Sequence, residues 1–314
     1  MTPAAMPSAV APPLITIGLP VYNSERHLPQ SIESLLSQTY RDFVLVISDN
    51  ASTDATPDIC RRYASQDSRV RYYRNVVNIG LSGNFNRVFE LNQSKYFKWA
   101  TADDFWASEM LEDAVAVLES DPSIVLCYPK TVIVDGEGRE QGPYEDKLHL
   151  MQEDPADRFL AVIENIRLVN QHLGVLRADA IGRTQLFGRH VSADIGFVAE
   201  MSLYGKFFEV KKHQFFRRFH AESSSWKRGD EEQEARRFHA ANVRRVPFNT
   251  WLYHRTFSRA VLHSPLSLAR KLRLLGRLGK LMYWDSRWLL EEVRRDLPPL
   301  LGLGGDASSP KKRR

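Results

Sequence analysis

The stretch Ala100-Thr101-Ala102-Asp103-Asp104 directly follows the largely apolar run Tyr96-Phe97-Lys98-Trp99 and is the most informative part of this chain. We interpret the run as a buried strand, so two neighbouring carboxylates stand at its end. Such carboxylates repel one another and are costly to desolvate without a partner. A hard divalent cation relieves both problems, because carboxylate oxygens are its preferred ligands. The alternative is a solvated turn or helix cap before Ser108.

Two similar polar segments follow predicted strands further upstream. Pro20-Val21-Tyr22-Asn23 comes after an apolar strand at 14–19, and Ser48-Asp49-Asn50 comes after another at 43–47. Amphipathic helical patterns separate these strands, and this alternation predicts a parallel sheet with right-handed crossovers. Open α/β sheets bind ligands at the carboxyl edge of their strands. We therefore expect all three polar segments to line one crevice.

Length and composition limit the class of protein. A chain of 314 residues can form one large α/β domain with a helical appendage. Because the sequence has neither Gly-x-Gly-x-x-Gly nor Gly-Lys-Ser/Thr, a Rossmann dehydrogenase and a P-loop NTPase are disfavoured. Its two cysteines, Cys60 and Cys127, fit small buried hydrophobes in a reducing compartment. We expect a disordered leader at 1–13, no membrane span, and a cytoplasmic location.

The net charge of +5 is distributed unevenly. Residues 1–226 hold 23 Lys and Arg against 29 Asp and Glu, which is −6, whereas 227–314 hold 20 against 9, which is +11. The second part contains a predicted amphipathic helix from Ser264 to about Met282. Leucines fill one side of it and basic residues fill most of the other, so an anionic partner surface is expected.

This helix allows two interpretations. Residues 264–295 could lie on an anionic membrane surface, or the leucine side could pack on the preceding domain while the arginine side is solvated. The last residues, 305–314, end in Lys311-Lys312-Arg313-Arg314 and are expected to form a flexible basic tail. No nucleic-acid partner is expected, because no aromatic-basic platform accompanies the charge.

Taken in order, the motifs from residue 14 to about residue 220 resemble the family 2 glycosyltransferases. The motifs that carry the resemblance are Pro20-x-Tyr22-Asn23 with Glu25, Ser37-Gln38-Thr39-Tyr40, Asp49-Asn50-Ala51-Ser52-Thr53-Asp54, Arg74-Asn75, Asn78-x-Gly80, Asp103-Asp104 and Arg218-x-His220.

The resemblance implies the A-type glycosyltransferase fold. This is an α/β fold with a mostly parallel nucleotide-binding sheet flanked by helices, here with a C-terminal helical extension. On this basis we expect a catalytic domain at 14–225 and a basic helical extension at 226–304.

The implied activity is metal-dependent, inverting transfer of a hexosyl-type sugar. The donor is a nucleotide-diphosphate sugar, with UDP- or dTDP-sugars favoured. The acceptor is a hydroxyl of a cell-surface glycan or of a lipid-linked acceptor, which fits a peripheral position on the inner face of the cytoplasmic membrane. The rival interpretation is a non-catalytic nucleotide-sugar-binding or membrane-scaffold protein that retains the fold.

By the same resemblance, Asp49 contacts the base, where its carboxylate can accept the N3–H of uracil or thymine. Pro20 and Tyr22 form a wall of the base pocket. The plainer alternatives are an Asx-turn at Asp49 and a strand-terminating turn at Pro20. The full set expected at the nucleotide sugar is Pro20, Tyr22, Asn23, Glu25, Asp49, Asn78, Gly80, Asp103, Arg218 and His220.

The resemblance assigns Asp103 to the ribose side and Asp104 to Mg²⁺ or Mn²⁺ at the diphosphate. The chain departs from the commonest form of this motif, because no further Asp stands at Thr101 or Ala102. The expected metal ligands are therefore Asp104 and Asp103, with their division of labour open.

Asp194 is the expected general base, because Ser192-Ala193-Asp194 opens the helix that follows the acceptor loop in the family. Glu200, nearly two turns further on, is the second candidate. The alternative for Asp194 is a helix cap or first-turn residue favoured by the helix dipole.

Overall fold

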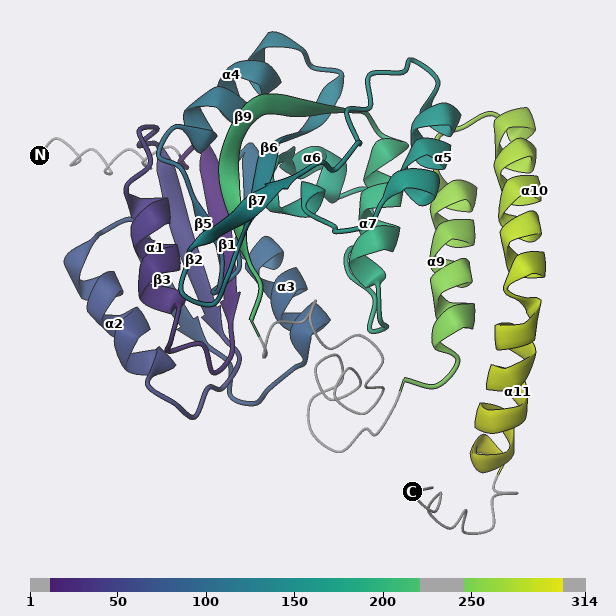
Figure 1. Ribbon diagram of the computed structural model, residues 1–314, viewed down its shortest axis with the longest axis horizontal. Helices are drawn as coiled ribbons and strands as arrows, with labels where there is room; N and C mark the ends of the chain where they lie inside the picture. Colours follow the sequence, from purple (N-terminus) through teal and green to yellow (C-terminus); the bar gives the residue numbers. More distant parts are fainter. Residues whose placement is uncertain (1–11, 221–245, 302–314) are drawn as a thin grey trace, which may run out of the picture.

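The computed structural model describes residues 12–220 and 246–301 (Figure 1). Its centre is one mixed sheet in the order β3-β2-β1-β4-β8-β6-β9-β5, with β7 paired to β6. The strands are β1 (Ile15–Val21), β2 (Phe43–Asp49), β3 (Val70–Arg74), β4 (Tyr96–Trp99), β5 (Phe105–Trp106), β6 (Ile124–Val134), β7 (Glu140–Tyr144), β8 (Val175–Arg177) and β9 (Lys206–Arg218).

Helices cover both faces of the sheet, and the last helices of the chain lie beyond it on one side (Figure 1). The helices are α1 (Leu28–Leu36), α2 (Thr56–Gln66), α3 (Leu81–Glu90), α4 (Met110–Ser120), α5 (Pro155–Asn165), the 3₁₀ turn η1 (Gln171–Leu173), α6 (Ala178–Ile181), α7 (Ala193–Ser202), α9 (Asn249–His263), α10 (Leu268–Trp284) and α11 (Ser286–Leu300). The predicted α/β class, with a mostly parallel sheet flanked by helices, is confirmed.

Strands β3, β2, β1 and β4 are parallel, as their alternation with helices predicts. In this register Val21 lies opposite Asp49, and Asp49 lies opposite Arg74. On the other side of β1, Gly18 lies opposite Trp99. The carboxyl ends of these strands therefore meet at one edge of the sheet, where the polar segments were expected.

The second half of the sheet differs from the sequence-based expectation. The apolar runs at 124–128 and 131–134 predict two strands, but they form the single strand β6, whose register against β9 shifts around Pro129 and Lys130. The polar composition of 139–154 predicts an irregular segment, which is wrong for 140–144, because β7 pairs with β6 there. Backbone pairing by the curved neighbouring strand compensates for a polar sequence that has weak strand preference.

Helix α2 starts differently from its predicted cap. The sequence Thr56-Pro57 predicts an N-cap at Thr56, but the N-cap position is Ala55, and the Thr56 hydroxyl accepts a hydrogen bond from the Ser24 amide at 2.8 Å. Asp54 instead accepts the Thr56 amide at 3.0 Å. The Thr56 side chain therefore bonds to the neighbouring β1–α1 loop and does not cap α2.

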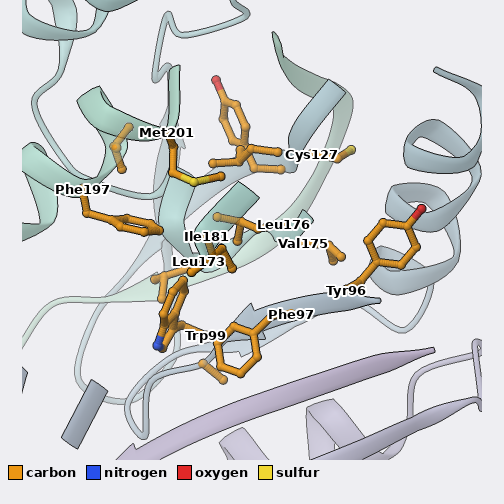
Figure 2. Packing of buried hydrophobic residues seen from close by; sticks show 14 of the residues in the cluster. Tyr96, Phe97, Trp99, Cys127, Leu173, Val175, Leu176, Ile181, Phe197 and Met201 are labelled. Atoms are coloured by element: carbon orange, nitrogen blue, oxygen red, sulfur yellow. The ribbon is translucent and has the colours of Figure 1, made fainter. Parts of the chain in front are cut away.

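The core is built around aromatic side chains of β4 and α7 (Figure 2). Trp99 packs edge-on against Phe97 and Phe197, with ring centroids 4.7 and 5.2 Å apart. Gly18 of β1 makes room for this packing, because a Cβ there would lie 2.5 Å from the Phe97 ring and 2.7 Å from Val88 of α3. Close packing of this kind fixes β4, whose end carries the two carboxylates.

The C-terminal helices share this core. Helix α9 packs against α7 so closely that a Cβ at Gly196 would lie 2.5 Å from Thr256. Val261 of α9 and both Leu274 and Leu278 of α10 belong to the same buried cluster as the sheet. Of the two interpretations of the basic helix, packing of leucines on the preceding domain is thus observed.

Replacing Leu278 by Ala should lower the free energy of unfolding by about 2–5 kcal/mol, because it leaves a cavity in a packed site. Leu272, on the same helix, is 60% exposed, so Leu272→Ala is a matched control with an expected change within about 0.5 kcal/mol. Chemical denaturation measures both. Similar small changes in the two variants would contradict the packing of α10 on the sheet domain.

Candidate active site

Asp49 ends β2 with a fully buried carboxylate that holds three partners. One oxygen accepts the Ser52 amide at 2.8 Å, and the other accepts the Tyr72 hydroxyl at 2.7 Å and the Arg74 guanidinium at 3.1 Å. Burial and the bond to Asp49 raise the pKa of Tyr72 to about 12, so this hydroxyl remains a donor. Asp49 therefore fixes the turn that follows β2 and orients the Arg74 side chain. Its contact with a nucleobase stays a prediction.

A network of side-chain amides fixes the loop that precedes α3. The side-chain amide of Asn50 donates to Oδ1 of Asn78 at 2.8 Å, and Oδ1 of Asn50 accepts from the Asn75 side chain at 3.0 Å. The same oxygen of Asn78 accepts the Gly80 amide at 2.8 Å. Gly80 has φ +79°, a conformation that favours glycine. The predicted Asn78–Gly80 loop is thus a rigid turn at the carboxyl edge of the sheet.

Asn84 is a member of this network that the sequence analysis missed. Its amide group joins Ser48 at the end of β2 through two bonds, one from the Ser48 hydroxyl at 2.7 Å and one to its carbonyl at 2.8 Å. It also accepts from Asn75. The available signal was an asparagine on the buried side of α3, one turn before Val88.

The segment after β1 mainly braces the loop after β2. Asn23, with φ +47°, accepts the Thr53 amide at 2.8 Å, and Glu25 accepts the Ala55 amide at 2.9 Å. Pro20 is buried within β1 opposite Ser48. Tyr22 differs from them because it is 48% exposed. It is the member of this segment whose ring is available to a ligand.

The two carboxylates after β4 have different surroundings. Asp104 is buried, and its oxygens accept the Arg218 amide at 2.8 Å and the Thr101 hydroxyl. Burial raises the pKa of Asp104, while these donors and the nearby Arg217 oppose the shift. The Asp103 side chain is 40% exposed, and one of its oxygens lies 3.4 Å from Nε2 of His220. Asp103 is thus the accessible member of the pair.

Arg218, at the end of β9, anchors this turn. Its Nε donates to the Asp103 carbonyl at 2.8 Å, and its Nη1 donates to the Gly136 carbonyl at 2.9 Å in the β6–β7 turn. The other Nη donates to Gln30 of α1. The Arg218 side chain is buried, and most of its N–H donors already bond to other parts of the protein. The expected contact with a diphosphate stays a prediction, and the geometry gives Arg218 a positioning role.

Two further bases behind the site were also missed, the buried Lys98 and the half-buried His27. Lys98 of β4 is fully buried, donates to the Leu173 carbonyl, and lies 4.3 Å from the Trp106 ring centroid. Burial lowers the pKa of Lys98 well below its usual value, opposed by the charge of Asp104. Burial and Arg218 lower the pKa of His27 to about 4, and its ring centroid lies 5.1 Å from that of His220. The sequence signal for Lys98 was its position within an otherwise apolar strand.

A divalent ion fits this edge only if a substrate supplies part of its coordination. Asp103 and His220 approach each other at the accessible side. Within residues 12–220 and 246–301, no group of three or more His, Cys, Asp or Glu could enclose an ion. Mg²⁺ commonly uses one or two protein carboxylates together with substrate phosphates. The residues present therefore suit a shared ion, and the exposure of Asp103 favours it over Asp104 as the ligand.

Asp194 is half-buried in the first turn of α7. Burial lowers the pKa of His190 and raises that of Tyr253; the charge of Asp194 opposes the first shift and adds to the second. The loop before α7 is tied to α3, because the Ser82 hydroxyl donates to the Gly188 carbonyl at 2.7 Å. The helix that follows the Asn78–Gly80 loop thus also holds the segment leading to Asp194. A base role for Asp194 stays a prediction.

Glu200, the second candidate base, faces the protein interior. It is 1% exposed and accepts the Gln185 amide at 2.9 Å. Burial raises the pKa of Glu200. Its bonds to Gln185 give it a structural role, which is to hold the loop before α7.

Sequence comparison identifies the family. The model described as "Glycosyl transferase family 2" matches residues 16–173, which is half of the chain. The chain belongs to glycosyltransferase family 2. This match contains the strand-end segments of β1, β2 and β4, so the resemblance stated from the motifs is confirmed.

Individual relatives of this family 2 member are distant. EpsE of Bacillus subtilis is 36% identical over 108 residues, which is 34% of this chain and 39% of that protein. Chondroitin synthase of Escherichia coli is 25% identical over 225 residues, which is 71% of this chain and 31% of that protein. The chain thus spans well under half the length of these two relatives.

Among solved structures, S. aureus TarS in complex with UDP-GlcNAc is similar to this fold. The TM-score is 0.66 at 16% identity, with 90% of this chain and 80% of that chain covered. This likeness confirms the A-type glycosyltransferase fold, with its sheet and C-terminal helical part, for this family 2 chain.

The anchoring role of Arg218 can be tested with Arg218→Lys. Lysine keeps the charge but lacks the planar fork that joins three segments. We expect the Mn²⁺-dependent part of UDP affinity to fall by about 10- to 100-fold, the usual effect of losing a residue that orients a metal ligand. Calorimetry with and without Mn²⁺ measures it.

Arg26→Lys is the matched control, because the Arg26 side chain is 64% exposed and lies 3.7 Å from Glu137. Its UDP affinity should stay as in the wild type. Unchanged Mn²⁺-dependent affinity in Arg218→Lys would contradict the anchoring role.

Proposed function

We propose that this family 2 chain transfers a sugar, with inversion, from a nucleotide-diphosphate sugar to an acceptor hydroxyl. The observation that carries the proposal is the convergence of three structures at one sheet edge. They are the Asp49 turn with Arg74, the rigid Asn78–Gly80 loop, and the exposed carboxylate of Asp103. Together they offer contacts for a base, a ribose and a diphosphate.

UDP- and dTDP-sugars are the favoured donors. Asp49 holds Arg74 by an ion pair at the end of β3, and Tyr22 contributes an exposed ring. A carboxylate beside a guanidinium suits the donor and acceptor edge of a pyrimidine, and the ring can stack on its face. Because Asp49 is buried, Arg74 and Tyr22 would make the first contacts with the base.

In the proposed site Asp103, supported by His220, holds Mg²⁺ or Mn²⁺, which when bound neutralises the charge that develops on the leaving diphosphate. Asp104 keeps the turn in place through Thr101 and the Arg218 amide. Asp194 accepts the proton of the attacking hydroxyl. Since the hydroxyl attacks opposite the departing diphosphate, one general base is sufficient.

The acceptor is proposed to be a cell-surface glycan or a lipid-linked acceptor, with the enzyme acting as a peripheral protein at the inner face of the cytoplasmic membrane. The positive charge of the C-terminal part, +11 over 227–314, supports an anionic surface nearby. A panel of UDP-, dTDP-, GDP- and ADP-sugars, screened by thermal stabilisation in the presence of Mn²⁺, tests the donor class. Stabilisation by ADP-sugars equal to that by UDP-sugars would contradict it.

Asp103→Asn should weaken Mn²⁺-dependent binding of UDP by about tenfold or more and reduce transfer, because a neutral amide is a poor ligand for a hard cation. Asp104→Asn should instead lower thermal stability, because an amide cannot accept at both of its original contacts. Calorimetry and differential scanning measure the two effects. If Asp104→Asn lost metal binding at unchanged stability while Asp103→Asn kept it, the assignment would be reversed.

Asp194→Asn should reduce turnover by about 10²–10⁴-fold while donor affinity stays within about twofold, because it removes a group that acts only in the transition state. Glu200→Gln is the comparison variant and should act on stability instead. Steady-state kinetics with calorimetric donor binding separates the two. Loss of donor affinity at an unchanged turnover number would exclude Asp194 as the base, and retention of the anomeric configuration in the product would overturn the mechanism.

A further inference from the structure

The outermost helices present an apolar surface that the proposed sugar transfer does not use. Helices α10 and α11 form the layer farthest from the sheet, beyond α9 (Figure 1). Several of their large apolar side chains are 57–76% accessible, far more than a packed helix normally shows. We call these residues the outer helical face: Leu268, Leu272, Tyr283, Trp284, Trp288 and Leu290.

On α10 three of these residues form a stripe. At 100° per residue, Leu268, Leu272 and Tyr283 fall within about 60° of one another, and Gly276 and Gly279 lie in or within about 20° of that sector. Trp284 lies about 100° further round the helix, on the side of Lys280. A Cβ added at either glycine would meet nothing within 4 Å in the described structure. The stripe is therefore open along the length of the helix.

The other sides of α10 are already occupied. Leu274 and Leu278 are in the core. The basic side, which one of the two interpretations leaves solvated, pairs with the acidic side of α5 and its N-cap. The ion pairs are Arg270–Asp154 at 3.2 Å, Arg273–Asp154 at 3.9 Å, Arg273–Asp157 at 3.0 Å and Arg277–Glu164 at 2.8 Å. These contacts hold the half-exposed arginine row beside α5 and leave the apolar stripe uncovered.

Cations border the aromatic end of this face. Lys280 lies 5.1 Å from the Trp284 ring centroid, and the Arg287 side chain is 84% exposed next to Trp288. Residues 264–295 hold eight Lys and Arg against three Asp and Glu, which is +5.

The acidic side chains here are engaged within the protein. Asp285 pairs with His254, Glu291 pairs with Arg287, and Glu292 accepts the Thr250 amide at the start of α9. The surface is thus apolar, aromatic and positively charged.

We propose that the outer helical face binds an anionic membrane surface, with Tyr283, Trp284 and Trp288 at headgroup depth. Aromatic side chains favour the membrane interface, and bordering Lys and Arg are attracted to anionic lipids. A second copy of the chain fits less well, because a twofold contact would bring two faces of like charge together. In the described part of the chain no helix combines the length and apolar composition that crossing a bilayer requires.

This inference rests on the proposed function in one respect, because it states where a lipid-linked acceptor would be met. The test is co-sedimentation of the full chain with vesicles of phosphatidylcholine alone or with 30% phosphatidylglycerol. We expect binding only to the anionic vesicles, weakened at high salt. The double variant Trp284→Ser/Trp288→Ser should bind about tenfold less or weaker still, because it removes two large apolar groups.

Leu262→Ser is the matched control, since Leu262 is 53% exposed at the end of α9, outside this face. It should bind as the wild type does. Equal binding by the double variant, equal binding to neutral vesicles, or no binding by the wild type would overturn the proposal. So would concentration-dependent dimerisation that the double variant abolishes, without vesicle binding.

UDP binding in solution, measured by calorimetry on the same samples, separates this inference from the proposed function. Intact UDP binding with no vesicle binding overturns the membrane surface alone. Vesicle binding by a chain that binds no nucleotide supports the membrane surface and contradicts the transfer function.

Discussion

The arrangement of this site depends on one set of hydrogen bonds, those that Arg218 makes at the end of β9. Its amide holds Asp104, its Nε holds the Asp103 carbonyl, and its Nη groups hold the β6–β7 turn and α1. Burying a guanidinium costs less free energy when acceptors satisfy its N–H donors than when those donors are left without partners. Segments more than a hundred residues apart thus converge on one turn, and Asp103 is left at its accessible side.

Other polar side chains along this edge of the sheet are held by the protein in the same way. Most polar side chains there are bonded to the protein: Asp49 to Tyr72 and Arg74, and Asn84 to Ser48. These bonds stiffen the loops, since a satisfied buried polar network has few alternative arrangements. The groups that a ligand could reach first are therefore few, chiefly Tyr22, Asp103 and the outer part of Arg74. Pre-organisation of this kind reduces the entropy lost on binding.

Sequence patterns predicted the parallel half of the sheet because β1, β2 and β4 are buried apolar runs and amphipathic helices separate its four strands. They failed at β7, whose polar residues 140–144 form a strand only because β6 is available to pair with them. They found Asp49 and Asp103-Asp104 through their positions at strand ends. They could not assign Arg218 or Asn84 to their partners, because the Asn84–Ser48 and Arg218–Gln30 contacts span 36 and 188 residues and depend on the folded register. The orientation of α10 likewise depends on acidic residues of α5 that helical periodicity alone does not reveal.

The central claim is that Asp103, held in place by Arg218, marks the metal and diphosphate position of this family 2 chain. Paramagnetic line broadening by Mn²⁺ in the presence of UDP tests it most directly, because broadening decreases steeply with distance from the ion. The account predicts that the amide signals of Asp103 and His220 broaden first, and that those of Glu200 and α10 stay sharp. Broadening centred elsewhere in the protein, or none while UDP is bound, would contradict the claim.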